Sequence, residues 1–362
     1  MRALVLRDFW DLSVEELPDP VPEPGDVLIR VTATGICGSD LHGFTGETNR
    51  RHPGQVMGHE TVGRVQSGPP PAPGGAPSGA AAGAAPAGGA VPGAAVAVNP
   101  VLACGQCAAC AAGREHACPH KRLIGVHPEI TSAFAELMAV PAGNLVPIPD
   151  TLPEEYGALV EPLAVGYHAA LRGECQPDDR VLVIGAGPIG QSCIAAAHRI
   201  GAMAVAASEP EPDRRALAGR LGAVPLDPGA GELPRLVAEA LAGPATLVLD
   251  AVGSDQSIGD SLGCSAPGAR IVLVGMAAPQ VGVPAYAVST EERSLIGSFC
   301  YSAAEFRGTA AWVSGQPPAL AHLIESRVDL DGAPAAFTRL ARGASTAAKV
   351  LVFPNGLPGE TR

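Results

Sequence analysis

The sequence predicts an α/β protein of two domains, one built mostly from β-strands and one built around a doubly wound parallel sheet. The chain has 362 residues, more than one ordinary hydrophobic core organises. From about residue 150, short apolar runs alternate with helical stretches, the pattern of a parallel sheet covered on both faces. The preceding residues show β-rich runs separated by turns instead.

The first domain is predicted over residues 1–150. Residues 3–6 and 26–32 are β-rich, and the Pro/Gly-rich segment 18–25 separates them. Residues 68–95 are almost entirely Ala, Gly, Pro and Ser, a composition that buries too little apolar surface to offset its ordering entropy. We therefore expect a flexible loop there.

The second domain is predicted over residues 151–297. It opens with a helical stretch at 156–172, and four short apolar runs then predict buried strands at 181–184, 204–207, 246–249 and 271–274. Residues 298–362 are expected to return to the first domain, because they end in the β-rich run 349–353.

Composition and charge exclude some classes of function. A formal net charge of −12 leaves no basic stripe for a nucleic acid or an anionic membrane. We find neither a secretory signal nor an apolar run of 18 residues free of Gly and Pro, so a cytoplasmic location is expected. In that reducing compartment, the nine cysteines are better explained as metal ligands or core residues than as disulfides.

A glycine pattern follows the predicted strand at 181–184. Gly185 permits a tight turn, Gly187 lets the backbone approach a pyrophosphate, and Gly190 allows close packing of helix on strand. Pro188 suits the first helical turn, whose free N–H groups bind anions. We expect a dinucleotide to contact Gly185, Gly187, Pro188, Ile189 and Gly190.

An acidic residue should stand at the end of the next strand, and Glu209 lies there, 19 residues after Gly190. Its carboxylate can accept from both ribose hydroxyls and would repel a 2′-phosphate, which favours NAD over NADP. A solvated loop acid is the alternative. Arg214 could flank the adenosine, reach a 2′-phosphate, or be an ordinary helix-surface arginine.

Four cysteines within fifteen residues form the most specific pattern. Four thiolates close a tetrahedral shell around Zn²⁺ and leave no position for water or substrate, which indicates a structural zinc. An iron–sulfur cluster is the rival, and a chance group of buried cysteines is the other alternative. The four are Cys104, Cys107, Cys110 and Cys118.

A second set of potential ligands is scattered along the chain. It comprises Cys37 with the neighbouring Ser39, Asp40 and His42, then His59 with Glu60, then Glu161. Each alone is weak evidence, since a lone Cys or His is more often a core residue. Their joint occurrence with the cysteine lobe and the glycine pattern is what indicates a catalytic centre.

With these motifs in this order, the chain resembles the zinc-containing medium-chain dehydrogenase/reductase superfamily over nearly its full length. It is most similar to the sorbitol/polyol and threonine dehydrogenase branch, because Glu161 stands where better-known alcohol dehydrogenases carry a cysteine ligand. The resemblance implies a GroES-like catalytic domain with a structural zinc lobe at about 99–120, and a Rossmann domain for NAD.

The resemblance also implies roles for the second set. Cys37 and His59 would bind a catalytic zinc, with Glu60 as the third ligand and Glu161 binding directly or through water. Asp40 could orient His59 through its second ring nitrogen. Ser39, with His42 beyond it, could relay a proton to solvent. His42 could equally be a ribose-binding or merely polar residue.

The implied enzyme carries two Zn²⁺ per chain and moves a hydride between NAD and a secondary alcohol or ketone such as a polyol, diol, cyclitol or hydroxy amino acid. The alternatives are a catalytically silent NAD-binding or redox-sensing protein and, more remotely, a zinc-free quinone reductase. Family members pair subunits near the strand at 295–299, so a homodimer or homotetramer is expected. The sequence does not single out one substrate. Its neighbours are expected among Phe44, Thr45, Arg51, His52, Phe299, Cys300 and Tyr301.

Overall fold

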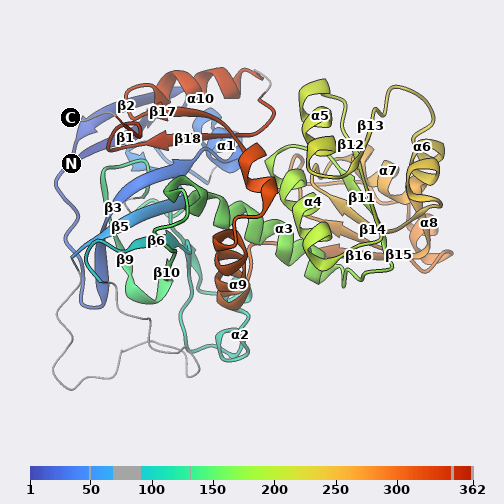
Figure 1. Ribbon diagram of the computed structural model, residues 1–362, viewed down its shortest axis with the longest axis horizontal. Coiled ribbons are helices and arrows are strands. Elements are labelled where there is room, and N and C mark those ends of the chain that lie inside the picture. The colour runs from blue at the N-terminus through green and yellow to red at the C-terminus, as the bar shows by residue number, and fades with distance from the viewer. Residues whose placement is uncertain (49, 68–90, 131, 344–345, 360–362) are drawn as a thin grey trace.

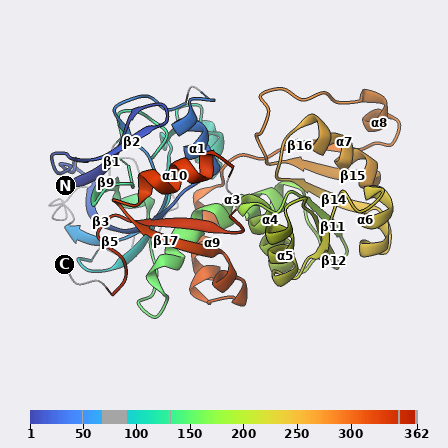
Figure 2. The same cartoon turned by 90° about the horizontal axis from the view of Figure 1, so that it is seen from above.

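The computed structural model describes residues 1–48, 50–67, 91–130, 132–343 and 346–359. Two lobes lie side by side, with long helices between them (Figure 1; seen from above in Figure 2). Most of the predicted loop, residues 68–90, lies outside the described residues. Within the described part of the chain, no helix combines the length and apolar character needed to span a membrane.

The first lobe is mostly β. A three-stranded sheet has the order β2-β1-β4, and a seven-stranded sheet has the order β10-β6-β5-β3-β18-β17 with β9 paired to β3. The strands are β1 (Arg2–Asp8), β2 (Asp11–Glu16), β3 (Asp26–Gly35), β4 (Gln55–Val56), β5 (Glu60–Ser67), β6 (Ala95–Val98), β9 (Leu137–Pro141), β10 (Leu145–Pro147), β17 (Ile324–Asp329) and β18 (Lys349–Phe353).

Short helices and one small hairpin complete this lobe. The hairpin pairs β7 with β8 beside the four cysteines. These elements are α1 (Gly38–Thr45), β7 (Val101–Leu102), α2 (Ala108–Ala111), η1 (Glu115–Ala117), β8 (Arg122–Leu123), η2 (Ala142–Asn144), η4 (Pro318–His322) and α10 (Ala333–Ala341).

The second lobe is a six-stranded, all-parallel sheet of order β13-β12-β11-β14-β15-β16. The strand order reverses between β11 and β14, the position where such sheets bind ligands beyond their carboxyl ends. Its elements are β11 (Arg180–Ile184), α4 (Pro188–Ile200), β12 (Ala204–Ser208), α5 (Pro212–Arg220), β13 (Val224–Leu226), α6 (Leu233–Leu241), β14 (Ala245–Asp250), α7 (Asp255–Cys264), β15 (Ser265–Leu273), α8 (Ala285–Ser289) and β16 (Ser294–Gly297).

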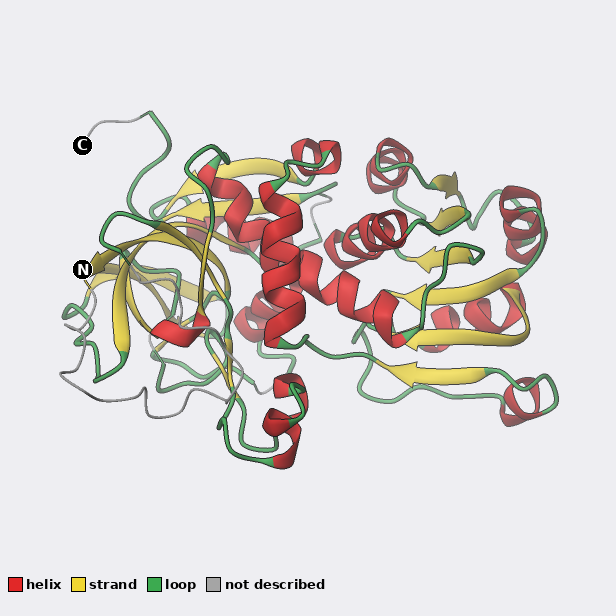
Figure 3. Ribbon diagram, turned by 60° about the horizontal axis from the view of Figure 1, so that its bottom comes forward, coloured by secondary structure: helices red, strands yellow, loops and turns green. Residues whose placement is uncertain are grey.

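Both faces of this sheet are covered by helices (Figure 3). Alternate side chains of one strand point to opposite faces, so Val181 and Val183 join one core with α4 while Leu182 and Ile184 join another with α6 and α7. All four predicted strands are present: β11, β12 and β14 agree with their expected ends within a residue, whereas β15 begins at Ser265, six residues before the predicted start. Continuous apolar runs therefore mark these strands because neither face meets solvent.

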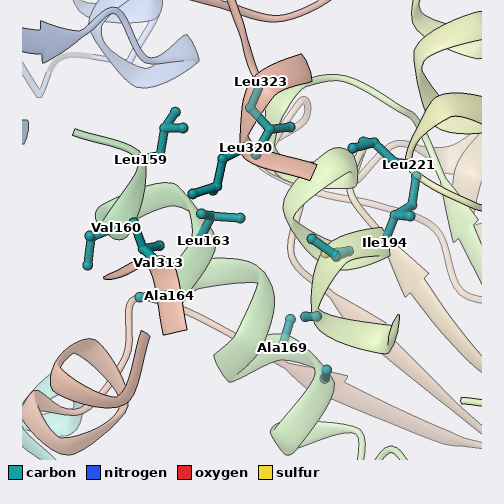
Figure 4. Close-up of a cluster of buried hydrophobic side chains, with 14 of the residues drawn as sticks. Leu159, Val160, Leu163, Ala164, Ala169, Ile194, Leu221, Val313, Leu320 and Leu323 are labelled. Carbon is teal, nitrogen blue, oxygen red and sulfur yellow. The ribbon is translucent and has the colours of Figure 1, made fainter. Parts of the chain in front are cut away.

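The lobes meet at α3 (Val160–Arg172), α4 and α9 (Ala303–Ser314). Figure 4 shows the buried side chains gathered there, among them Leu159, Leu163 and Leu320. The predicted helix at 156–172 differs at its start, because η3 (Glu154–Leu159) precedes α3. Pro162 explains the boundary, since proline lacks an N–H and is tolerated only in a first helical turn.

The chain leaves the β-rich lobe after β10 and returns to it after α9. The returning strand β18 pairs antiparallel with β3, placing Leu351 opposite Gly35. This pairing carries residues from the end of the chain into contact with the second ligand set.

Candidate metal centres and dinucleotide site

Sulfur, nitrogen and oxygen donors converge where β3 and β5 meet. One ligand atom each from Cys37, His59 and Glu60 lies within 4.8 Å of the others. The register explains the convergence, because Gly35 pairs with Glu60 across these antiparallel strands. Cys37 therefore follows the end of β3 at the same edge where His59 precedes β5.

A buried acid and arginine hold the imidazole. His59 Nδ1 lies 3.5 Å from Asp40 Oδ1, within ion-pair distance although it forms no hydrogen bond among the described residues, and this approach leaves Nε2 as the nitrogen for a metal. Arg51 Nη2 donates to the same Asp40 oxygen at 3.2 Å, and the Cys37 N–H donates to the other at 3.2 Å. Burial alone would raise the pKa of Asp40, but His59 and Arg51 hold it below its usual range.

Glu60 is divided between this centre and a lysine. Lys349, at the start of β18, forms a buried ion pair with Glu60 Oε1. Glu60 Oε2 is buried and has no hydrogen-bond partner among the described residues. A Cβ on Gly35 would lie 2.0 Å from Oε2, so only glycine leaves room for this carboxylate. Burial opposes the Lys349 charge, but Glu60 and Cys37 raise its pKa to about 12.

Glu161 approaches from the first turn of α3. The Tyr301 hydroxyl donates to its Oε1 at 2.9 Å, and both side chains are buried. Burial raises the pKa of Glu161 to about 7, with His59 lowering it and Glu60 raising it. Among the described residues, the group of donors within 4.8 Å of one another includes no Glu161 atom.

These donors fit Zn²⁺, which binds thiolate, imidazole and carboxylate. The unpartnered Glu60 Oε2 is the kind of buried atom that a cation would satisfy. Burial would lower the pKa of His59, but Asp40 and Cys37 raise it well above its usual value. The negative field that favours a proton on His59 would equally attract a divalent cation.

The four cysteines form a second, closed group. Their ligand atoms all lie within 4.8 Å of one another, with Cys107–Cys110 and Cys104–Cys110 sulfur distances of 3.5 and 3.9 Å. A tetrahedral zinc with bonds of 2.3 Å separates its sulfurs by about 3.8 Å, so the group fits this metal. All nine cysteines of the chain are free.

Histidines and glutamates dock the cysteine lobe onto the helices between the lobes. His116 packs edge-on to His168 at 4.6 Å, and His168 Nδ1 lies 3.0 Å from Glu305 Oε2. Glu115 Oε2 accepts from the Ala303 N–H at 3.2 Å. Burial would raise the pKa of Glu305, but His168 and the Ser302 N–H lower it to about 2.

The glycine pattern forms a tight turn at the start of α4. Gly185 adopts φ +83°, and a Cβ on Gly190 would lie 1.8 Å from the Gly185 carbonyl oxygen. Gly187 is the N-cap and Pro188 the first residue of α4, with Ile189 next. The glycines thus serve the turn and the close approach expected of them.

Glu209 follows β12 and faces this turn. Its carboxylate accepts from the Ala186 N–H at 2.7 Å and from the Glu211 N–H at 2.9 Å, so it is not a solvated loop acid. Arg214 Nε donates to the Thr346 carbonyl at 3.0 Å, which joins α5 to the returning segment before β18. A Cβ on Gly187 would lie 3.9 Å from Arg214 Nη1, so the guanidinium borders the same turn.

Ser39 and His42 lie on α1. Ser39 is half-buried next to the Cys37 cap, and His42 has 44% of its side chain exposed with Nδ1 2.6 Å from Glu47. The two residues therefore span from the metal centre toward solvent.

Sequence reasoning missed Lys349 altogether and considered Arg51 and Tyr301 only as pocket neighbours. A signal for Lys349 existed, since it is the one charged residue of an otherwise apolar strand. Its partner was unpredictable, because Glu60 lies 289 residues away in the sequence.

Comparison with known proteins agrees with this geometry. The alcohol dehydrogenase GroES-like domain family matches residues 23–150, and the zinc-binding dehydrogenase family matches residues 188–315. An L-threonine 3-dehydrogenase of Stenotrophomonas maltophilia is 35% identical over 288 residues, which cover 76% of this chain and 77% of that protein. The chain belongs to the zinc-containing medium-chain dehydrogenase/reductase superfamily.

Other members of the superfamily match over the whole length. A sorbitol dehydrogenase of Bacillus subtilis is 28% identical over 98% of both chains. The structure of a zinc-binding dehydrogenase from Sinorhizobium meliloti bound to NADP superposes with a TM-score of 0.84 and 29% identity, covering 98% of this chain and 99% of that one. The protein is a zinc-dependent oxidoreductase acting on alcohols with a nicotinamide dinucleotide, and its GroES-like and Rossmann folds are confirmed.

Proposed function

We propose that the protein exchanges a hydride between NAD and a secondary alcohol or its ketone at a centre formed by Cys37, His59 and Glu60. The observation that carries this proposal is the convergence of one sulfur, one nitrogen and one oxygen donor within 4.8 Å. Glu161 supplies a further carboxylate from α3. Cys104, Cys107, Cys110 and Cys118 would hold a second, structural zinc.

A zinc held at the first centre would supply Lewis acidity that favours loss of the substrate hydroxyl proton. The residues around it orient its ligands, carry the proton away and neutralise charge. Asp40 fixes the imidazole of His59 with Nε2 toward the centre, and Arg51 fixes Asp40. Ser39 takes the departing proton, and His42 passes it to solvent, since its side chain is 44% exposed. Lys349 keeps one oxygen of Glu60 neutralised.

The dinucleotide would lie at the carboxyl ends of β11 and β12. Its pyrophosphate meets Gly185, Gly187, Pro188, Ile189 and Gly190 at the start of α4. Glu209 is buried and already accepts two backbone N–H groups, so its charge is held in place to receive ribose hydroxyls. A 2′-phosphate beside this carboxylate would be repelled, which favours NAD although the similar structure from Sinorhizobium meliloti is bound to NADP. Arg214 flanks the adenosine.

We further propose a homodimer or homotetramer in the cytoplasm. The edge strand β16 has no neighbour on its outer side within the described sheet, so a second copy could extend it. Nine free cysteines suit a reducing compartment. Domain boundaries near residues 150 and 297 accord with the departure of the chain from the β-rich lobe after β10 and with the end of the parallel sheet at β16, ahead of α9.

Metal analysis combined with an NADH-coupled screen tests this function. Freshly purified protein should contain two Zn²⁺ per chain and should oxidise members of a panel of polyols, diols and hydroxy amino acids. Cys37→Ser should retain one zinc and lose at least about a hundredfold in turnover. Cys264→Ser, which alters a buried cysteine of the other lobe, is the matched control and should keep both. Zinc-free fresh protein, or full turnover by Cys37→Ser, would contradict the proposal.

A further inference from the structure

We propose that Lys121 forms an anion subsite beside the substrate position, so that the preferred alcohol carries a carboxylate or phosphate group. This inference rests on the proposed function and narrows its substrate class. It stands on the segment that links Glu161 to the surface, on the environment of Lys121 and on the lysine content of the chain.

The segment from Phe299 to Tyr301 joins the metal centre to the surface. Cys300 adopts φ +56°, a left-handed conformation that a β-carbon disfavours. On one side of this turn, Tyr301 is buried and donates to Glu161 at 2.9 Å. On the other side, Phe299 is 40% exposed. A group that contacts Phe299 is therefore two residues from the side chain that binds Glu161.

Lys121 contacts Phe299 from the cysteine lobe. Its Nζ lies 5.7 Å from the centroid of the Phe299 ring, within the range of a cation–π interaction. The turn after Cys118 positions it, through a Lys121 N–H donated to the Cys118 carbonyl at 3.2 Å. A closed zinc shell at Cys118 would make this turn rigid and so fix the backbone position from which the Lys121 side chain extends.

The Lys121 charge has no protein partner in the described part of the chain. No described carboxylate lies within 4.0 Å of its Nζ, and the side chain is half-buried. The ammonium is thus free to pair with an anion from outside.

The chain contains only two lysines among its 24 basic residues, and the rest are arginines. One lysine, Lys349, pairs with Glu60 inside the metal centre. The other, Lys121, lies beside the segment that reaches Glu161. Of the two compact ammonium groups in a sequence that otherwise uses arginine, one therefore contacts the metal centre and the other contacts the segment that leads to Glu161.

The Cys300 thiol, next to Tyr301 in the chain, lies in the field of Glu161 and of the cationic groups Lys121 and Arg50. Burial raises the pKa of the Cys300 thiol to about 12, Glu161 raises it further, and Lys121, His59 and Arg50 lower it. The charges of the Glu161 carboxylate, Lys121 and Arg50 therefore all act on one half-buried thiol. Arg50 is exposed and adds a second positive charge near Cys300.

Matched neutral and anionic alcohols test the subsite. The variant is Lys121→Gln, and the control is Arg122→Gln, which removes the same charge from the exposed neighbouring residue. The zinc-loaded protein is assayed with NAD on glucitol, gluconate and glucitol 6-phosphate, and on 2,3-butanediol and 3-hydroxybutyrate. Each assay is run at low and high salt, and titration calorimetry measures binding of the same five compounds without NAD.

We expect wild type to prefer an anionic member, and Lys121→Gln to lower its kcat/KM about tenfold to hundredfold through KM, with neutral alcohols changed less than about twofold. Arg122→Gln should resemble wild type. Preference for gluconate identifies a carboxylate, and preference for glucitol 6-phosphate a phosphate.

Two results would overturn the subsite: a wild type that favours the neutral member of each pair, or equal losses on both members in Lys121→Gln. Either would mean that Lys121 only covers Phe299. A zinc-replete wild type that oxidises no alcohol of any charge would instead overturn the proposed function.

Discussion

The ammonium of Lys349 and the carboxylate of Glu60 join β18 to β5 inside the candidate catalytic centre. Both side chains are almost fully buried, the second Glu60 oxygen has no described hydrogen-bond partner, and the carboxylate lies within 4.8 Å of the donors from Cys37 and His59. One carboxylate thus stands between a fixed cation and the position of a bound one. Lys349 and a bound metal would both neutralise the negative charge of Glu60.

Replacing Lys349 by methionine removes the fixed cation and leaves the volume nearly unchanged. We expect the metal-free protein to lose about 3–5 kcal/mol of unfolding free energy, because Glu60 becomes an unpaired buried charge. The zinc-loaded protein should lose less, since the metal can neutralise the same carboxylate. Urea unfolding of both forms measures the difference.

The double variant Glu60→Gln with Lys349→Met supplies the control. It removes both charges and should recover most of the stability lost by Lys349→Met in the metal-free protein. Equal destabilisation of the metal-free and zinc-loaded forms by Lys349→Met would show that zinc and lysine do not share Glu60.

Asp40→Asn tests the support of the imidazole. The amide keeps the shape but loses the charge that faces His59 and Arg51, so zinc at this centre should bind about 10–100-fold more weakly. Chelator competition resolves the two zinc ions by their release. The cysteine-bound zinc is the internal control, and a similar change in its affinity would indicate general unfolding instead.

Glu209→Ala tests the cofactor preference. Loss of the carboxylate removes the ribose acceptor and frees the Ala186 and Glu211 N–H groups. We expect the KM for NAD to rise about tenfold or more and the ratio of kcat/KM for NADP to that for NAD to increase. Glu211→Ala, an exposed acid two residues along, should leave the ratio unchanged. An unaltered ratio in Glu209→Ala would remove the argument for NAD.

Glu305→Gln tests how the cysteine lobe is docked. The pKa of Glu305 is lowered to about 2 in the folded protein, from an ordinary value of 4.5. Its contribution is therefore fully present above about pH 4.5 and is lost as the pH falls from there through about 2. We expect the variant to be less stable by about 1–2 kcal/mol at pH 7, with the difference shrinking below pH 4.5. Urea unfolding of both proteins at pH 7 and below pH 4.5 measures this difference in unfolding free energy. A difference that does not change with pH would refute the prediction.

The elements of the fold were predictable where one local pattern decides the structure. The strand at 181–184 shows this, because four apolar residues that lead directly into Gly185 are typical of a buried strand followed by a tight turn. The start of α3 was less so, since the six residues before Val160 are helical in composition yet form a 3-10 turn ahead of Pro162.

The ligand set was predictable by residue type, but its internal pairing was not. Cys37, His59 and Glu60 could be grouped through known motifs, whereas the partner of Glu60 depends on the register of β18 against β3. That register arises from long-range packing. The same reason hid the contact between Tyr301 and Glu161, which are 140 residues apart.

The pairing of Lys349 with Glu60 can form only late in synthesis of the chain. The two residues are 289 positions apart. At about 5–20 residues per second, the ribosome adds the lysine roughly 15–60 s after the glutamate. During that interval Glu60 of the nascent β-rich half has no lysine partner, so it is either hydrated or bound to a metal ion. The supply of zinc in the cell therefore influences the state of this half before β18 is synthesised.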